Sequence, residues 1–381
     1  MRRIAFVTGS RGEYGYIRPL IRRIEKDPQL EYSIIVTNLH LLPEFGFSVE
    51  DIERDGFRIS DRLYMALDGY TPASMSKSLG VCLMSMTDTL VRLRPDIVVV
   101  AGDRGEQLMA AMAAAYMNIP VVHIQAGELS GNIDGMTRHA ITRFAHLHLA
   151  ATEEAAERLR RMGEQPFRIH LIGAPQLDEL VNGEYAGRDE VAGAFRLALD
   201  RPLALFVQHP VTEEYEQTDT QVRESLEALC ALRMQTVAIF PNNDAGNRQI
   251  RRLIEQYRRP FLRIERNVPR QMFLGLMNVA SVMVGNSSSG LIEAPWFKLP
   301  AINVGHRQRG RERAANVIDV ETDRRKIRAA IEQALSPTFR RRLARQCRNP
   351  YQGDGPVADR IVRLLKTVRV TDELLKKQIA Y

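Results

Sequence analysis

Short apolar runs rich in β-branched residues alternate with helical patterns along nearly the whole chain. In the first half, strand patterns lie at Ile4–Thr8, Tyr32–Thr37, Ile97–Ala101 and Val121–Ile124, and helical patterns lie at Ile17–Lys26 and Gln107–Met117. The strand patterns are continuously apolar, which is typical of strands that are buried on both faces of a parallel sheet. Strands interleaved with helices predict right-handed βαβ units in a doubly wound sheet.

A second series of the same kind follows a polar segment, Asn182–Asp200, which we interpret as a hinge region. Its strand patterns lie at Leu203–Gln208, Thr236–Phe240, Val282–Gly285 and Ala301–Val304. The length of 381 residues suits two domains of ordinary size. We therefore expect an α/β fold of two Rossmann-like domains with a central cleft. The first covers residues 1–180 and the second 181–356, and a C-terminal helix and tail, 357–381, pack back on the first.

Composition restricts where the protein works. The chain is 45% hydrophobic and 26% charged, and no run reaches the roughly 18 apolar residues that a membrane span needs. The basic and then apolar start, Met1–Val7, ends too soon at Gly9 to be a signal peptide. The three cysteines are far apart and form no zinc or disulfide pattern. We expect a cytoplasmic protein without a membrane partner.

The net charge of +7 has two explanations. One is nucleic-acid binding, and the other is an arginine-rich surface combined with a site for a small anion. The arginines are spread along the chain, and no nucleic-acid-binding motif is recognisable. The second explanation is therefore favoured, and we expect no nucleic-acid partner.

Ligands of open α/β sheets bind at the carboxyl ends of the strands, so we expect the chemistry in the loops that follow them. In "TGSRGEYG", backbone N–H groups and Arg11 suit a phosphate, although an ordinary glycine-rich turn explains the loop equally well. In "AGDRGEQ", Asp103 is either a helix cap or a catalytic acid or base. Taken alone, the loop favours a cap.

The richest loop is "HIQAGELSGNIDGMTRHAI", where Gln125, Glu128 and Asp134 follow a strand. Clustered carboxylates raise one another's pKa values and so divide acid from base roles. The alternative is that Asp134 caps a helix and Arg138 neutralises Glu128. Since Asp103 follows the adjacent strand and adds a third carboxylate, we favour a catalytic cluster.

The second half supplies groups that suit a nucleotide. "QHPVTEEY" places His209 at a strand end, and the serines of "VGNSSSGLIEAP" precede a helix whose amides can bind phosphate. Glu293, one turn inside that helix, can bind ribose hydroxyls, and Arg307 lies in "GHRQRGRE". The serines do not form a G-x-S-x-G elbow, and no metal-ligand spacing is found in the sequence. These loops suggest a nucleotide-sugar enzyme without a metal.

These motifs together resemble the UDP-N-acetylglucosamine 2-epimerase family, and within it the hydrolysing branch of sialic-acid-type pathways. The resemblance covers nearly the full length and includes "TGSRGEYG", "GDRGE", "HIQAGELSGNIDGMTRHAI", "HPVT", "PNNDAG", "GNSSSGLIEAP", "INVGHRQRGRE" and "NPYQGDGPVADRI". It implies the two-domain fold shared with B-type glycosyltransferases. It also implies elimination of UDP from UDP-N-acetylglucosamine to a 2-acetamidoglucal, followed by hydration to N-acetylmannosamine.

The resemblance also implies a site, no cofactor, UDP-sugar and UDP as ligands, and a homo-oligomer, either a dimer or a tetramer. The implied catalytic residues are Asp103, Glu128, Asp134 and His209. The implied UDP- and sugar-binding residues are Arg11, His40, Gln125, Asn243, Ser287, Ser288, Ser289, Glu293 and Arg307. Gln125 stands where many relatives carry an acid after "HI", which leaves open which carboxylate deprotonates C2.

Three alternatives stay open at this point. The first is the same reaction on UDP-N,N'-diacetylbacillosamine, a 4-acetamido-6-deoxy analogue used in legionaminic acid synthesis. The second, a B-type glycosyltransferase, needs an acceptor site in place of three carboxylates. The third, a UDP-sugar sensor, needs no acids at all. The sequence does not place the residues that contact C4 and C6 of the sugar.

Overall fold

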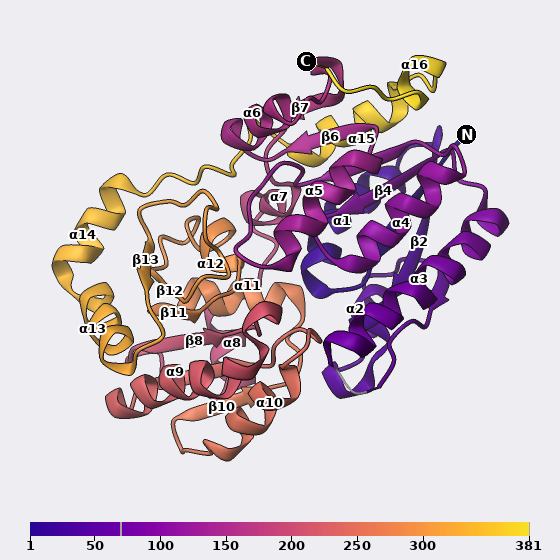
Figure 1. Ribbon diagram of the computed structural model, residues 1–381. Helices are drawn as coiled ribbons and strands as arrows, with labels where there is room; N and C mark the ends of the chain where they lie inside the picture. Colours follow the sequence, from indigo (N-terminus) through magenta and orange to yellow (C-terminus); the bar gives the residue numbers. More distant parts are fainter. Residues whose placement is uncertain (69–70, 381) are drawn as a thin grey trace.

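The computed structural model describes residues 1–68 and 71–380. The chain forms two α/β lobes, each built on one parallel sheet (Figure 1). This architecture confirms the predicted fold of two Rossmann-like doubly wound domains.

The first sheet has the strand order β3-β2-β1-β4-β5-β6-β7, and its described pairings are all parallel. Its strands are β1 (Arg2–Thr8), β2 (Leu30–Thr37), β3 (Ile59–Leu63), β4 (Ile97–Ala101), β5 (Val121–Ile124), β6 (Leu147–Ala150) and β7 (Ile169–Leu171). From β1 the strands are added outward to β2 and β3 on one side, and the chain then crosses over to add β4 to β7 on the other side. The loops after β1 and β4 therefore flank the switch point, where open α/β sheets bind ligands.

The helices around the first sheet come from the first half of the chain and from its C-terminus. They are α1 (Arg11–Ile24), α2 (Val49–Arg54), α3 (Pro72–Leu93), α4 (Gly105–Tyr116), α5 (Ile133–Phe144), α6 (Glu153–Arg161), α7 (Asp178–Val181), α15 (Val357–Thr367) and α16 (Asp372–Leu375).

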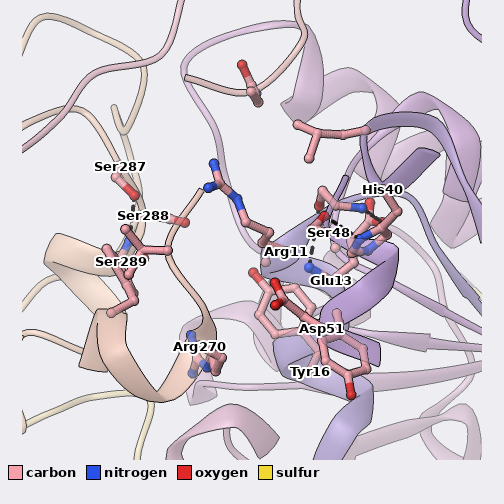
Figure 2. A pocket seen from close by; sticks show the side chains of 18 of the residues that line it. Arg11, Glu13, Tyr16, His40, Ser48, Asp51, Arg270, Ser287, Ser288 and Ser289 are labelled. Carbon is pink, nitrogen blue, oxygen red and sulfur yellow. Dashed lines mark hydrogen bonds between the residues drawn. The ribbon is translucent and has the colours of Figure 1, made fainter. Parts of the chain in front are cut away.

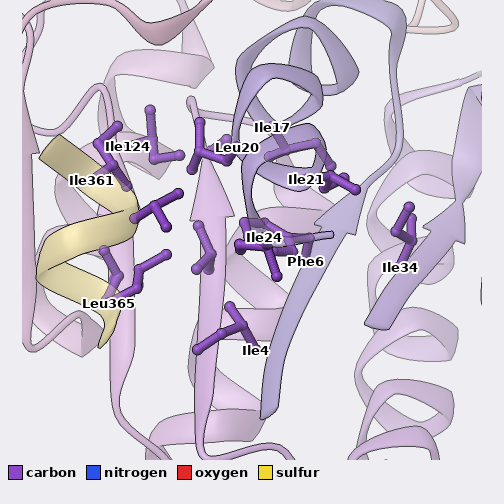
Figure 3. Close-up of a cluster of buried hydrophobic side chains, with 14 of the residues drawn as sticks. Ile4, Phe6, Ile17, Leu20, Ile21, Ile24, Ile34, Ile124, Ile361 and Leu365 are labelled. Atoms are coloured by element: carbon purple, nitrogen blue, oxygen red, sulfur yellow. The ribbon is translucent and has the colours of Figure 1, made fainter. Parts of the chain in front are cut away.

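Strand β1 shows why the strand patterns are continuously apolar. Ile4 and Phe6 pack in one core with α1 and α15 (Figure 3). Ala5 and Val7 lie in a second core, against α3, α4 and α5. Successive side chains of a strand point to opposite faces, and both faces are covered here, so every position must be apolar.

The second sheet has the order β10-β9-β8-β11-β12-β13, again with parallel pairings. Its strands are β8 (Leu203–Val207), β9 (Gln235–Ile239), β10 (Leu262–Glu265), β11 (Val282–Gly285), β12 (Ala301–Val304) and β13 (Val317–Val320). Its helices are α8 (Arg188–Phe195), α9 (Thr218–Leu232), α10 (Asn247–Gln256), α11 (Arg270–Val279), α12 (Ser289–Ile292), α13 (Arg324–Leu335) and α14 (Pro337–Gln346).

The C-terminal helix α15 returns to the first lobe. Both carboxylate oxygens of Asp178 accept hydrogen bonds at its start, from the backbone N–H of Val357 at 3.0 Å and of Ala358 at 2.8 Å. A carboxylate at a helix N-terminus is stabilised by the helix dipole. Further along, Ile361 and Leu365 are fully buried in the core that contains β1.

Two features of the fold depart from the pattern. The edge strands β3, β7, β10 and β13 escape prediction, because an edge strand leaves part of its surface in solvent and carries polar residues. The inner strand β6 also escapes prediction, since it has only four residues and a histidine interrupts its apolar run. The segment 182–200, which we interpret as a hinge region, contains the helix α8, whose Val191 and Phe195 pack in a core of the second lobe.

Candidate active site

A cleft of about 260 Å³ lies where the carboxyl ends of the two sheets meet (Figure 2). In this view the serine loop of the second lobe faces Arg11, His40 and α1 of the first lobe. Most of the site residues predicted from the sequence line it: Arg11, His40, Asp103, His209, Ser287, Ser288, Ser289, Glu293 and Arg307. Glu128, Asp134, Gln125 and Asn243 lie outside its lining.

Asp103, directly after β4, is held as an anion. Its carboxylate accepts hydrogen bonds from the guanidinium of Arg138, which is fully buried, and from the Ser130 hydroxyl at 3.2 Å. Burial alone would raise the pKa of Asp103, but the charges of Arg138 and Arg311 outweigh burial and hold the pKa below its usual value. Asp103 is not a helix cap, because α4 begins at Gly105 with Arg104 in the cap position.

Asp134, in the first turn of α5, has the opposite shift. It accepts hydrogen bonds from the side-chain amide of Asn132 at 2.9 Å and from Arg307 of the second lobe at 3.2 Å. Burial, and next the charge of Asp103, raise the pKa of Asp134 to about 6. The cap position of α5 belongs to Asn132, so Asp134 is not the cap either. Two carboxyl groups whose pKa values are driven apart are the arrangement that assigns an acid and a base.

Glu128 does not pair with the groups that bind Asp103 and Asp134. It is buried and forms an ion pair with Arg311 of the second lobe at 2.8 Å. Arg138 binds Asp103 rather than Glu128, so the alternative in which Arg138 neutralises Glu128 does not hold. Glu128 therefore links the two lobes outside the cleft lining.

The two histidines of the cleft are both neutral. Burial lowers the pKa of His40 to about 3, and its ring bridges the hydroxyls of Thr8 at 3.0 Å and Ser48 at 2.8 Å. Burial, and then the charge of Arg307, lower the pKa of His209 well below its usual value. The Nδ1 of His209 accepts the backbone N–H of Asn242 at 3.0 Å, so its proton is on Nε2. His209 is therefore a hydrogen-bond donor toward the cleft.

Gln125 and Asn243 do not face the cleft. Gln125 is buried and adopts a left-handed backbone conformation with φ of +59°, and its side-chain amide has no hydrogen-bond partner in the described residues. Asn243 crosses between the lobes, because its amide donates to Asn38 and its oxygen accepts from Arg104 at 3.2 Å.

The second-lobe wall is built from the loop after β11. Ser287, Ser288 and Ser289 line the cleft, and the short helix α12 begins at Ser289. Glu293 follows that helix, is buried, and accepts a hydrogen bond from Arg270 at 3.1 Å. The position of Glu293 next to the serines, rather than among them, agrees with a group that binds hydroxyls near a phosphate site.

The glycine-rich loop after β1 does not offer its first amides to a ligand. The carboxylate of Glu13 accepts the backbone N–H groups of Gly9 and Ser10, in a capping box at the start of α1. Glu13 thus satisfies two of the amides that were expected to bind phosphate, and for those of Arg11 and Gly12, which line the cleft, phosphate binding stays a prediction. Arg11 instead extends across the cleft and donates to Asn267 of the second lobe at 3.0 Å.

The lobes also touch closely at Gly131. Its backbone N–H donates to the carbonyl of Arg307 at 2.8 Å, and a Cβ at this position would lie 1.9 Å from the carbonyl oxygen of His306. Only glycine allows this approach. It holds the loop that precedes Asp134 against the arginine loop of the second lobe.

Sequence reasoning misses Arg104 and Arg270, two cleft-lining arginines that form ion pairs around the site. Arg104 pairs with Asp244 of the second lobe at 2.8 Å, and Arg270 pairs with both Glu179 and Glu293. Arg104 could have been found, because it follows Asp103 directly in "GDRGE". Arg270 has no local motif, and its role depends on contacts between distant segments.

Within residues 1–68 and 71–380, no group of three or more His, Cys, Asp or Glu side chains is arranged to hold a metal ion. In the same residues, no helix has both the length and the apolar character to cross a membrane.

Comparisons with known proteins agree with the motifs. The family model of UDP-N-acetylglucosamine 2-epimerase matches residues 22–366. The chain is 38% identical to a UDP-N,N'-diacetylbacillosamine 2-epimerase (hydrolyzing) of Legionella pneumophila, over the full length of both. It is 33% identical to a GDP/UDP-N,N'-diacetylbacillosamine 2-epimerase (hydrolyzing) of Campylobacter jejuni, over 89% of each chain.

A similar solved structure is the UDP-GlcNAc 2-epimerase of Neisseria meningitidis bound to UDP-GlcNAc. It superposes with a TM-score of 0.79 over 95% of this chain and 99% of that one, at 20% identity. At that identity the likeness establishes the fold alone.

Proposed function

The chain belongs to the UDP-N-acetylglucosamine 2-epimerase family, and on that premise we propose that it is a hydrolysing 2-epimerase of a UDP-linked 2-acetamido sugar. The observation that carries the proposal is the pair Asp103 and Asp134. One carboxyl group is held ionised and the other keeps its proton to about pH 6, and both lie beside Arg307 of the second lobe.

The pair suits elimination followed by hydration. The C2 hydrogen of the intact sugar is not acidic, and becomes so only as the C1–O bond breaks and C1 gains positive charge. Asp103, as the anion, accepts that proton while UDP departs with the electron pair of the C1–O bond. Asp134, as the acid, then delivers a proton to C2 of the glucal from the other face. Water adds to C1 and returns its proton to Asp134.

The groups of the second lobe suit the leaving diphosphate. Arg307, the serine loop and the Nε2–H of neutral His209 donate hydrogen bonds to the charge that develops on UDP. Glu293 binds the ribose hydroxyls, a contact that exists in substrate and product alike. Arg11 completes this site from the first lobe when the cleft is closed.

Glu128, Asn243 and Gln125, outside the cleft lining, and His40 within it have supporting roles in this proposal. Glu128 holds the arginine loop through Arg311, and Asn243 holds Arg104 in place. Gln125 contributes its left-handed backbone to the loop that carries Glu128, and His40 bonds the hydroxyls of Thr8 and Ser48. None of these four needs to exchange a proton with the substrate.

Two donors fit this proposal, UDP-N-acetylglucosamine and UDP-N,N'-diacetylbacillosamine. Proton NMR of each reaction in deuterated water, without any acceptor, tests it. We expect free UDP and the free 2-epimeric sugar with deuterium at C2. A product that retains its substrate proton at C2 would exclude elimination. UDP release that requires an added acceptor would favour a glycosyltransferase.

A further inference from the structure

A second cavity, of about 90 Å³, lies beside the cleft, and we call it the side pocket. Its walls are the loop after β3, the starts of α3, α4 and α5, and the loop after β9 of the second lobe. A single water needs roughly 10–15 Å³ on such a scale, so the side pocket has room for several waters.

Polar side chains reach the side pocket from both lobes. Nine of the residues that line it are polar or charged: Asn38, Ser74, Ser78, Arg104, Glu106, Asp134, Thr137, Asn243 and Asp244. A water inside a protein needs about two to four hydrogen-bonding partners, and a cavity with this lining supplies them.

Asp134 connects the side pocket to the proposed reaction. It lines the side pocket and not the cleft. The hydrogen bonds that it accepts from Asn132 and Arg307 both end on its Oδ2 atom. Among the described residues, none donates a hydrogen bond to Oδ1, and Oδ1 is not one of the fully buried atoms that lack a partner. This carboxylate oxygen is therefore available to a water in the side pocket.

Thr137 supplies a second group for the same water. It follows Asp134 by three residues on α5, so the two side chains share one face of that helix. Thr137 is half-buried and lines the side pocket, and its hydroxyl forms no hydrogen bond within the described residues. One water can therefore contact both the Oδ1 of Asp134 and this hydroxyl.

The boundary between the two cavities consists of charged side chains. Arg104 lines both cavities, and Arg307, which donates to Asp134, lines the cleft. In the proposed function the cleft is closed during elimination and excludes bulk water, but the second half of the reaction needs one water at C1. A water bound at Asp134 lies next to the cleft without being part of it.

We propose that the side pocket is the water site of the hydration step and holds the water that adds to C1 of the glucal. The inference rests on the proposed function and assigns a site to its second substrate. After Asp134 has given its proton to C2, its Oδ1 accepts a hydrogen bond from the water, and Thr137 accepts the other. The water oxygen then bonds to C1, one O–H bond breaks, and that proton returns to Asp134.

The test fills the side pocket from two walls and compares each filling variant with an exposed position on the same helix. Thr137→Phe fills it from α5, and its control is Met136→Phe, where Met136 is 71% exposed. Met75→Trp fills it from α3, and its control is Met84→Trp, where Met84 is 67% exposed. Proton NMR measures UDP, glucal and free 2-epimeric sugar, with whichever of the two donors the wild type turns over faster.

We expect both filling variants to release UDP within about twofold of the wild-type rate, because elimination precedes hydration. The ratio of released glucal to free 2-epimeric sugar should rise about 10-fold or more, since the attacking water loses a hydrogen bond to a carboxylate. Hydration of purified glucal in the presence of UDP should slow by the same factor. Both controls should match wild type.

The other outcomes separate the inference from its premise. An unchanged glucal ratio in the filling variants, equal losses of UDP release and hydration, or the same rise in the controls would each overturn the inference while the proposed function stands. If neither filling variant folds, Thr137→Val decides, because it removes the hydroxyl at nearly constant volume, and an unchanged ratio would again overturn the inference. Absence of UDP release by the wild type from both donors would overturn the proposed function itself.

Discussion

Replacing Asp103 by Asn tests the assignment of the base most directly. The substitution keeps the size of the side chain and removes the charge that would accept the C2 proton. We expect kcat to fall by about 10²–10³-fold, or roughly 3–4 kcal/mol of transition-state stabilisation. UDP affinity, measured by calorimetry, should change little, because the proposed function places Asp103 at the sugar and not at the nucleotide.

The same variant should move the pH profile. The charge of Asp103 is the second cause, after burial, of the raised pKa of Asp134. A raised pKa means that the acid form of Asp134 survives to about pH 6, so kcat/KM of the wild type should fall above that pH. In Asp103→Asn one raising influence is gone, so the pKa of Asp134 drops and the fall should begin at lower pH.

A loss of fold must be separated from a loss of chemistry. Arg138 is fully buried, and Asn supplies it with a weaker acceptor than a carboxylate, so we expect the free energy of unfolding to fall by about 1–3 kcal/mol. Asp96→Asn is the control at the opposite end of β4, since Asp96 pairs with Arg3 at 3.4 Å and its side chain is 41% exposed. It should cost less than about 1 kcal/mol. Near-wild-type turnover of folded Asp103→Asn, with an unmoved pH profile, would refute the assignment.

Three further variants test the roles of Glu128 in the first lobe and of Glu293 and Arg307 in the second lobe. Glu128→Gln leaves Arg311 buried without its counter-ion, so we expect a loss of turnover together with a drop of roughly 3 kcal/mol in unfolding free energy, measured by denaturant titration. Lost turnover at wild-type stability would instead give Glu128 a direct chemical role. Glu293→Ala should raise KM and weaken UDP binding about 10-fold with kcat nearer to normal, because its contact is the same in substrate and product. Arg307→Ala should weaken UDP binding and also lower kcat, since it loses stabilisation of the leaving group. Unchanged UDP affinity in both of the last two variants would mean that the nucleotide binds elsewhere.

The sequence by itself determined the family, the two-lobe fold and nine of the residues that line the cleft. Buried parallel strands such as Ile97–Ala101 must be apolar at every position, so their pattern is visible without a structure. Loops that follow such strands converge at one edge of a sheet by topology alone. This is why Asp103, His209 and the serine loop could be assigned to a shared site from their positions along the chain.

Only the tertiary structure decided which charged side chains form ion pairs with one another. Asp103 and Asp134 differ in pKa because the charges of Arg138 and Arg311 outweigh burial at Asp103, whereas at Asp134 burial and the charge of Asp103 outweigh Arg307. Glu128 does not belong to the catalytic cluster that the sequence predicts, because Arg311 of the second lobe forms an ion pair with it. Electrostatic interactions depend on separation in space and on burial, and neither quantity is fixed by separation along the chain.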